Sequence, residues 1–149
     1  MKQPHHLSLS VQYAADTAAM PTRQQFRRWV KAALQQDMQC TLRIVNEEEG
    51  HVLNRDYRGK DYATNVLTFV YDNTVPLSGD VVICAPVVAR ESSEQGKELI
   101  AHYAHLTLHS ILHLQGYDHE NEAEASVMEA LETALMRKLG YPAPYEFTT

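Results

Sequence analysis

The stretch "ELIAHYAHLTLHSILHLQGYDH", residues 98–119, combines the pattern of a buried helix with a set of regularly spaced histidines. Between residues 98 and 114, apolar side chains fall on every side of a helical wheel, which is typical of a helix surrounded by other elements. Gly116 follows, and glycine often ends a helix because it adopts left-handed backbone conformations at little cost. We therefore expect a central helix that ends near Gly116.

Three histidines of this stretch, His109, His113 and His119, have the spacing of metal ligands. Residues four apart on a helix are neighbours, with Cβ atoms about 5–6 Å apart, so His109 and His113 can reach one ion. The turn expected at Gly116 can bring His119 back to it. Three protein ligands with an open fourth position are typical of catalytic zinc. The pattern HxxxHxxGxxH thus predicts a zincin-like site for one Zn²⁺ ion, although nickel or another divalent metal also suits three imidazoles.

Two further histidines, His102 and His105, lie near the same helix face, so His105 and His109 form a competing pair at four-residue spacing. The triple above is preferred because the glycine turn accounts for its third ligand. We expect His102 and His105 either to support the ligands or to contact phosphate. Asp118 precedes the third ligand, and it can orient a ligand imidazole or cap the next helix. The sequence favours neither role.

Ser110 stands where the H-E-x-x-H peptidases carry the glutamate that acts as general base. A serine hydroxyl is no base at neutral pH without a base of its own, which argues against a peptidase. Zinc lowers the pKa of bound water to about 7, and RNA brings a nucleophile in its 2′-hydroxyl, so RNA cleavage needs that carboxylate less. Ser110 itself either contacts water or substrate or faces the protein interior; the pattern leaves this open.

Phosphoryl chemistry needs positive charge on the phosphate oxygens, and the candidate cations lie in "LNRDYRGKDYATNVLTF", residues 53–69. Arg58 and Lys60 belong to a polar segment between an expected helix and an expected strand. Arginine binds phosphate through a bidentate fork that lysine does not reproduce. On composition alone, a solvated loop is the simpler interpretation of both cations. A second basic cluster lies on the first expected helix, at Arg23, Arg27, Arg28 and Lys31. We interpret it as a solvated face, with an RNA- or ribosome-facing patch as the alternative.

The rest of the chain alternates between strand and helix patterns. Strand patterns occur at residues 7–14, 39–46, 66–71 and 79–86. Helix patterns occur within residues 20–37, at 47–58, across 86–116 with a break near Gly96, and at 120–140. This order predicts one α+β domain spanning residues 1–149, in which a small mixed β-sheet of about four strands is covered by about five helices.

Length, charge and cysteine content limit the class of protein. The 149 residues suit one domain with a real core, and no run approaches the roughly 18 apolar residues of a membrane span. The N-terminal segment lacks the apolar stretch of a signal peptide, so we expect a cytoplasmic protein. Cys40 and Cys84 are expected to be inert buried thiols. The formal net charge of −6 argues against a surface that binds nucleic acid everywhere, but it allows a local basic patch.

Taken together, "HLTLHSILHLQGYDH", "YRGKDYATNVLTF" and "SGDVVIC" resemble the bacterial YbeY family. The resemblance runs from about residue 42 to residue 145, and the motifs match in order and separation as well as in content. It implies a metal-dependent endoribonuclease, specific for single-stranded RNA, that acts in 3′-end maturation of 16S ribosomal RNA and in ribosome quality control. The implied partners are ribosomal RNA and the small ribosomal subunit, with no membrane.

Carried over by position, His109, His113 and His119 match the metal ligands of the family, and Arg58 matches its functionally important arginine. On this resemblance we expect Arg58 and His109 to be catalytic, and Arg58 and Lys60 to bind RNA. The chain departs from the family in small ways: serine replaces the usual glycine after the first ligand, "TFV" replaces "SFP", and "SGD" replaces "LGD". None of these removes a ligand or the arginine.

The alternative function is that of a non-catalytic ribosome-assembly factor whose metal only stabilises the fold. The open fourth coordination position argues against it, because structural zinc usually takes four protein ligands.

Overall fold

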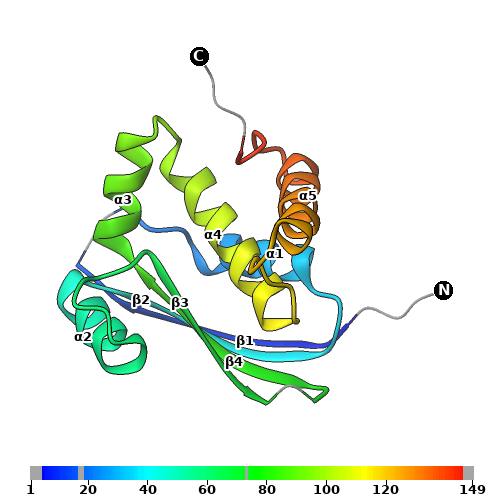
Figure 1. The fold of residues 1–149 in the computed structure, drawn as a ribbon, viewed down its shortest axis with the longest axis horizontal. Helices are drawn as coiled ribbons and strands as arrows, with labels where there is room; N and C mark the ends of the chain where they lie inside the picture. The colour runs from blue at the N-terminus through cyan, green and yellow to red at the C-terminus, as the bar shows by residue number, and fades with distance from the viewer. Residues whose placement is uncertain (1–4, 17–18, 73, 146–149) are drawn as a thin grey trace.

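The computed structural model describes residues 5–16, 19–72 and 74–145 (Figure 1). Its elements follow the order β1 (Leu7–Ala14), α1 (Arg23–Ala33), β2 (Met38–Val45), α2 (Glu47–Arg58), β3 (Val66–Asp72), β4 (Leu77–Cys84), α3 (Ala85–Glu94), α4 (Leu99–Leu114) and α5 (Glu122–Lys138). The described residues thus confirm the predicted α+β class, with a four-stranded sheet and five helices. None of these helices is long and apolar enough to cross a membrane.

The sheet has the strand order β1-β2-β4-β3 and is mixed, as predicted. Strands β1, β2 and β4 run parallel to one another, whereas β3 runs antiparallel to β4. The short connection between β3 and β4 is possible only between antiparallel neighbours, whereas longer connections join the parallel strands: α1 lies between β1 and β2, and α2 and β3 lie between β2 and β4. Strand β3 therefore forms one edge of the sheet, and α4 packs beside it.

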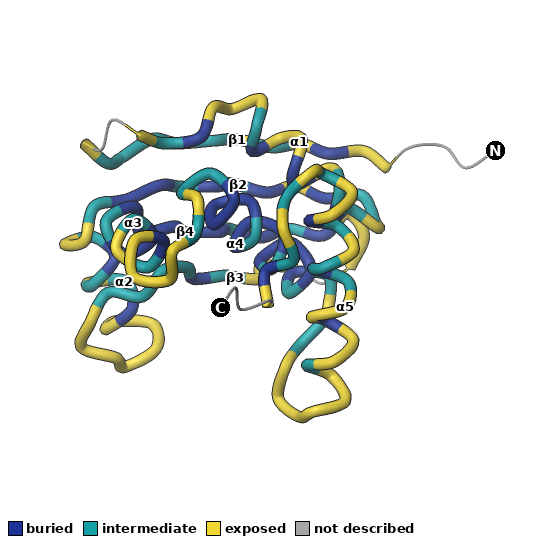
Figure 2. Tube along the Cα trace, turned by 90° about the horizontal axis from the view of Figure 1, so that it is seen from above, coloured by how far each residue is buried: buried dark blue, intermediate teal, exposed yellow. Residues whose placement is uncertain are grey.

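Helix α4 is the buried helix that the sequence predicts. It packs against α1, α3, α5 and β3, and Figure 2 shows it enclosed by these elements. Its side chains Leu108, Ile111 and Leu112 are fully buried in the main apolar core, between the helix and one face of the sheet. Burial of this apolar surface is the dominant force that holds α4, and with it the histidines, in place.

Alternation along β4 divides the apolar side chains between the two faces of the sheet. Val81 and Ile83 belong to the main core under α4, whereas Val82 and Cys84 belong to a smaller core. Leu53 of α2 packs against that smaller core, so α2 lies on the face of the sheet opposite α4. The C-terminal end of α2 then lies close to the edge strand β3.

The sequence prediction changes at the junction between β4 and α3. The strand predicted at residues 79–86 spans Leu77–Cys84, because Pro86 belongs to the first turn of α3, where a missing backbone N–H costs nothing. The break expected near Gly96 is present, since Gly96 has a positive φ of 64° between α3 and α4. Cys40 and Cys84 are both free and buried, as predicted.

Candidate metal centre

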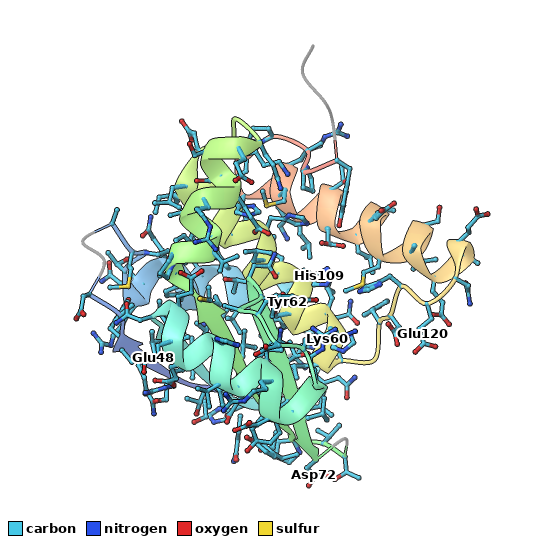
Figure 3. The ribbon with its side chains drawn as sticks, turned by 60° about the vertical axis from the view of Figure 1, so that its left-hand side comes forward. Glu48, Lys60, Tyr62, Asp72, His109 and Glu120 are labelled. Carbon is cyan, nitrogen blue, oxygen red and sulfur yellow. The ribbon has the colours of Figure 1, made fainter. Side chains whose placement is uncertain are left out.

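A cavity of about 500 Å³ opens between α4, the C-terminal end of α2 and the first residues of β3. The residues that line it are Tyr57, Arg58, Val66, Leu67, Thr68, Phe69, His109, His113, Asp118 and His119. The cavity therefore brings Arg58 together with the three histidines of the motif. Figure 3 shows His109 on α4 and the loop after α2 that carries Lys60 and Tyr62.

The end of α4 positions the three histidines. His109 and His113 lie on its last turns, and Gly116 then adopts a φ of 103°, which only glycine reaches cheaply. The chain turns there, and the His119 ring lies with its centroid 5.5 Å from that of His109. Gln115 holds the turn against α1, because its side-chain amide donates to the carbonyl of Ala33 over 2.8 Å.

The three imidazoles at this cavity supply nitrogen donors of the type that a divalent ion binds. His109 Nδ1 lies 3.2 Å from a carboxylate oxygen of Glu132, and His113 Nδ1 is buried without a partner. Within the described ranges, no protein group is bonded to the Nε2 atom of His109 or of His113. Imidazoles with an uncommitted nitrogen in one cavity form the donor set that zinc, nickel or copper prefers.

A group of acidic residues adjoins the third histidine. The carboxylate oxygens of Asp118, Glu120 and Glu124 lie within 4.8 Å of one another, and this group is half-buried to exposed. Among the described residues, Asp118 forms no hydrogen bond to an imidazole and does not cap α5. Its carboxylate accepts a hydrogen bond from the backbone N–H of His119 over 2.8 Å, and α5 is capped by Asn121 instead.

Glu132 of α5 is a functional candidate that sequence reasoning missed. It is only 1% exposed, and its Oε1 atom lies 2.6 Å from His105 Nε2 and 3.2 Å from His109 Nδ1. The Tyr145 hydroxyl donates to the same carboxylate over 3.0 and 3.1 Å. Burial acts to raise the pKa of Glu132, but the hydrogen bonds from His105 and His109 outweigh it and lower that pKa to about 2.

His102 and His105 lie outside the first cavity and line a second one, of about 990 Å³. His102 is 5% exposed, its Nε2 lies 3.0 Å from a carboxylate oxygen of Glu91, and burial lowers its pKa despite that partner. His105 contacts Glu132 through its Nε2. The competing pair His105 and His109 therefore converges on one carboxylate and not on a shared ion.

Ser110 faces the protein interior. Its side chain is fully buried, and its hydroxyl donates to the carbonyl oxygen of Leu106 over 2.8 Å, one turn back along α4. Of the two roles left open for this serine, the structure supports the interior one.

Arg58 is the last residue of α2, and its exposed side chain lines the cavity. In residues 5–16, 19–72 and 74–145, no carboxylate pairs with it, whereas the neighbouring Arg55 pairs with Asp56 over 3.2 Å. Tyr57, which is 68% exposed, stands beside it and meets Phe69 of β3 edge-to-face with ring centroids 5.1 Å apart. Lys60 is exposed on the following loop and does not line the cavity.

The N-terminal part of α2 forms ion pairs with β2 and with α3, and these contacts fix the orientation of the helix. Arg43 of β2 donates two hydrogen bonds to Glu49, over 2.6 and 2.9 Å, and Arg90 of α3 donates to Glu47 over 2.7 Å. The helix ends at Gly59, whose φ of 68° turns the chain away and leaves Arg58 at the cavity.

Comparisons with known proteins place the chain in a family. The family model described as Endoribonuclease YbeY matches residues 10–140. The Endoribonuclease YbeY of Nitrosomonas europaea is 58% identical over 148 residues, covering 97% of this chain and 90% of the relative. That of Aromatoleum aromaticum is 59% identical over 142 residues, covering 93% of this chain and 92% of the relative. The solution structure of TM1509 from Thermotoga maritima matches with a TM-score of 0.57 and 21% identity, over 88% of this chain and 91% of that one, a likeness that shows the fold alone. The model match and the identities together show that the chain belongs to the YbeY family.

Proposed function

We propose that this chain, acting as one domain, is a metal-dependent endoribonuclease that cleaves single-stranded RNA in the cytoplasm. We further propose that it acts at the small ribosomal subunit, in 3′-end maturation of 16S ribosomal RNA and in ribosome quality control. The observation that carries the proposal is the single cavity that holds three motif histidines and an arginine without a carboxylate partner among the described residues. Membership of a family named for endoribonuclease activity supports RNA as the substrate.

In this proposal His109, His113 and His119 hold one divalent ion, with zinc as the first candidate and nickel as another. The bound ion would polarise the scissile phosphate and lower the pKa of a bound water. His109 is assigned a catalytic role as well, because it lies in the cavity and is the ligand next to the buried Glu132.

Arg58 is proposed to bind the phosphate at which cleavage occurs. A guanidinium donates two parallel hydrogen bonds to phosphate oxygens, and positive charge placed there stabilises the transition state. Because no carboxylate in the described part of the chain competes for Arg58, binding RNA breaks no ion pair. Lys60, exposed two residues later and outside the cavity, is proposed to contact a neighbouring phosphate as a point charge.

The aromatic wall of the cavity supports a preference for single strands. Tyr57 is 68% exposed and borders the same cavity as Arg58, with Phe69 packed against it. Unpaired bases can turn outward and stack on aromatic side chains, whereas bases within a duplex cannot. With a net charge of −6, the protein is expected to bind RNA through this local set of residues and not through its whole surface.

Cleavage of an unstructured RNA by purified variants tests the proposal. We expect the wild type to cut, His113→Ala to be inactive, and Arg58→Ala to be slower by about 10²–10³-fold, the usual effect of losing one donor to a transition state. Arg55→Ala is the matched control, because Arg55 lies on the same helix but pairs with Asp56 and does not line the cavity. Circular dichroism checks that each variant is folded.

If Arg58→Ala cuts as fast as Arg55→Ala, Arg58 does not bind the reacting phosphate. If every preparation cuts alike, the activity belongs to a contaminant and the assembly-factor alternative takes over. A cyclic phosphate at the cleaved ends would identify the 2′-hydroxyl as nucleophile, and its absence throughout the reaction would indicate attack by water.

A further inference from the structure

The buried carboxylate of Glu132 has an environment that requires explanation. It lies on α5, is 1% exposed, and carries three partners on its two oxygens: His105, His109 and Tyr145. Removing a carboxylate from water is costly, and replacing a buried charge by an apolar side chain is often neutral or stabilising. Stability alone is therefore a weak reason for placing this group against the metal cavity.

The hydrogen bonds to Glu132 determine where the protons are. An ionised carboxylate only accepts hydrogen bonds, so each partner must donate: His109 through Nδ1–H, His105 through Nε2–H and Tyr145 through its hydroxyl. A neutral imidazole carries one N–H. With that proton on Nδ1, the lone pair of His109 is on Nε2, which has no protein partner among the described residues.

We propose that Glu132 is a positioning residue that holds His109 as the Nδ1–H tautomer and so presents its Nε2 to the metal ion. This inference rests on the proposed metal centre. A carboxylate in this position fixes the rotation of the imidazole ring and makes its other nitrogen a better donor to the ion.

The two other partners of Glu132 hold its carboxylate in the position that contacts His109 Nδ1. His105 Nε2 lies 2.6 Å from the same oxygen that contacts His109, and the Tyr145 hydroxyl reaches both oxygens. His105 is thereby excluded as a ligand, since its Nε2 donates to Glu132 and its Nδ1 is buried. Tyr145 follows α5, so the segment after that helix contributes to the centre although it does not line the metal cavity.

The first test measures the tautomer directly. In the zinc-loaded wild type, the ¹⁵N chemical shifts of His109 are expected to show the proton on Nδ1 and the metal on Nε2. This readout does not depend on cleavage of RNA. Coordination through Nδ1 would contradict the proposal at once, because that nitrogen cannot bind the ion and donate to Glu132 together.

The second test replaces Glu132 by glutamine, which keeps the size of the side chain but removes the charge and half of its accepting capacity. Competition with a chromophoric chelator measures the zinc affinity of each variant. We expect Glu132→Gln to bind zinc about 10–100-fold more weakly than the wild type does. The visible spectrum of the cobalt-substituted variant is expected to change too, because His109 can rotate. Glu129→Gln, at an exposed position of the same helix, is the matched control and should change neither.

Tyr145→Phe removes one of the three donors at a side chain that is 41% exposed, and it is expected to weaken zinc binding less than Glu132→Gln does. If Glu132→Gln does not fold, the proposal is still tested by the tautomer of His109 in the wild type and by the zinc affinity of Tyr145→Phe. Zinc affinity in Glu132→Gln equal to that in Glu129→Gln overturns the proposal. A wild type that binds zinc through His109 Nε2 but cleaves no RNA would instead overturn the proposed function and leave the role of Glu132 standing.

Discussion

Burial decides what a side chain next to the proposed metal ligand His109 can do. Ser110 follows His109 directly, yet its side chain is fully buried and its hydroxyl is bonded to the carbonyl of Leu106. Consecutive residues on a helix do not face the same way, so the hydroxyl belongs to the packed side of α4 while His109 belongs to the cavity. A nucleophilic or water-binding role for this serine is therefore not part of the proposed reaction.

Ser110→Ala tests this placement. We expect kcat/KM for RNA cleavage to stay within about twofold of the wild type, and the free energy of unfolding to fall by no more than about 1 kcal/mol, the usual contribution of one hydrogen bond. Urea denaturation measures the second quantity. A tenfold loss of kcat in a variant of unchanged stability would show that the hydroxyl takes part in catalysis.

Local spacing was enough to identify the histidines of the cavity, but it could not identify Glu132. The motif histidines lie within eleven residues of sequence, and the glycine turn between them is visible in the sequence. Glu132 lies on α5, 23 residues further along the chain than His109 of α4, and contacts it only because the two helices pack together. One local signal was available: Glu132 is four residues from Met128 and from Met136, so it lies on the apolar face of α5, where an unpaired carboxylate does not belong.

Composition alone favoured a solvated loop for Arg58, and the structure explains why composition could not decide. The side chain is indeed exposed, but it stands at the rim of the cavity because α2 ends there and because both sides of that helix are tied to neighbouring elements. These ties connect residues far apart in sequence, and no local pattern contains them.

Among the elements, β3, β4 and the end of α4 meet at a point where only glycine fits. A Cβ atom on Gly79 of β4 would lie 2.6 Å from the carbonyl oxygen of Phe69 and 2.9 Å from a methyl carbon of Leu114. Phe69 lines the cavity, and Leu114 is the last residue of α4. The close approach of these elements therefore sets the distance between the edge strand and the histidine-bearing end of the helix.

Gly79→Ala is expected to lower the free energy of unfolding by about 1–3 kcal/mol, because the backbone of β3 must shift to admit the methyl group. The shift moves Phe69, so cleavage of RNA should fall as well. Chemical denaturation measures the stability, and Ser78→Ala on the same strand is the control. Equal stability of the two variants would mean that the elements tolerate a wider separation than the structure shows.

The type of most elements was predictable from periodicity, but the pairing of the strands was not. The short connection between β3 and β4 made an antiparallel pair predictable in principle, whereas the order β1-β2-β4-β3 depends on contacts between distant segments. The start of α3 was misplaced for a local reason: Pro86 closes an apolar run in the sequence, yet it sits in the first helical turn.

At the scale of the whole molecule, the apolar core is built without the three histidines of the cavity. One continuous cluster of buried apolar side chains runs from β1 to α5, and the three histidines lie outside it, at the cavity. An ion held by them would connect the end of α4 with the loop that follows it, and no more distant elements. The structure therefore favours a fold that forms without the ion. This is expected of a catalytic metal but not of a structural one.

Removal of the metal by a chelator is accordingly expected to abolish RNA cleavage while the near-ultraviolet circular dichroism spectrum stays that of a folded protein. Adding zinc back should restore cleavage and raise Tm by several degrees, because an ion at 100 times its Kd stabilises the folded state by about 2.7 kcal/mol. His113→Ala serves as the control, since its Tm should not respond to zinc. Loss of the folded spectrum on chelation would show that the ion is structural, and the assembly-factor alternative would then account for the histidines better than catalysis does.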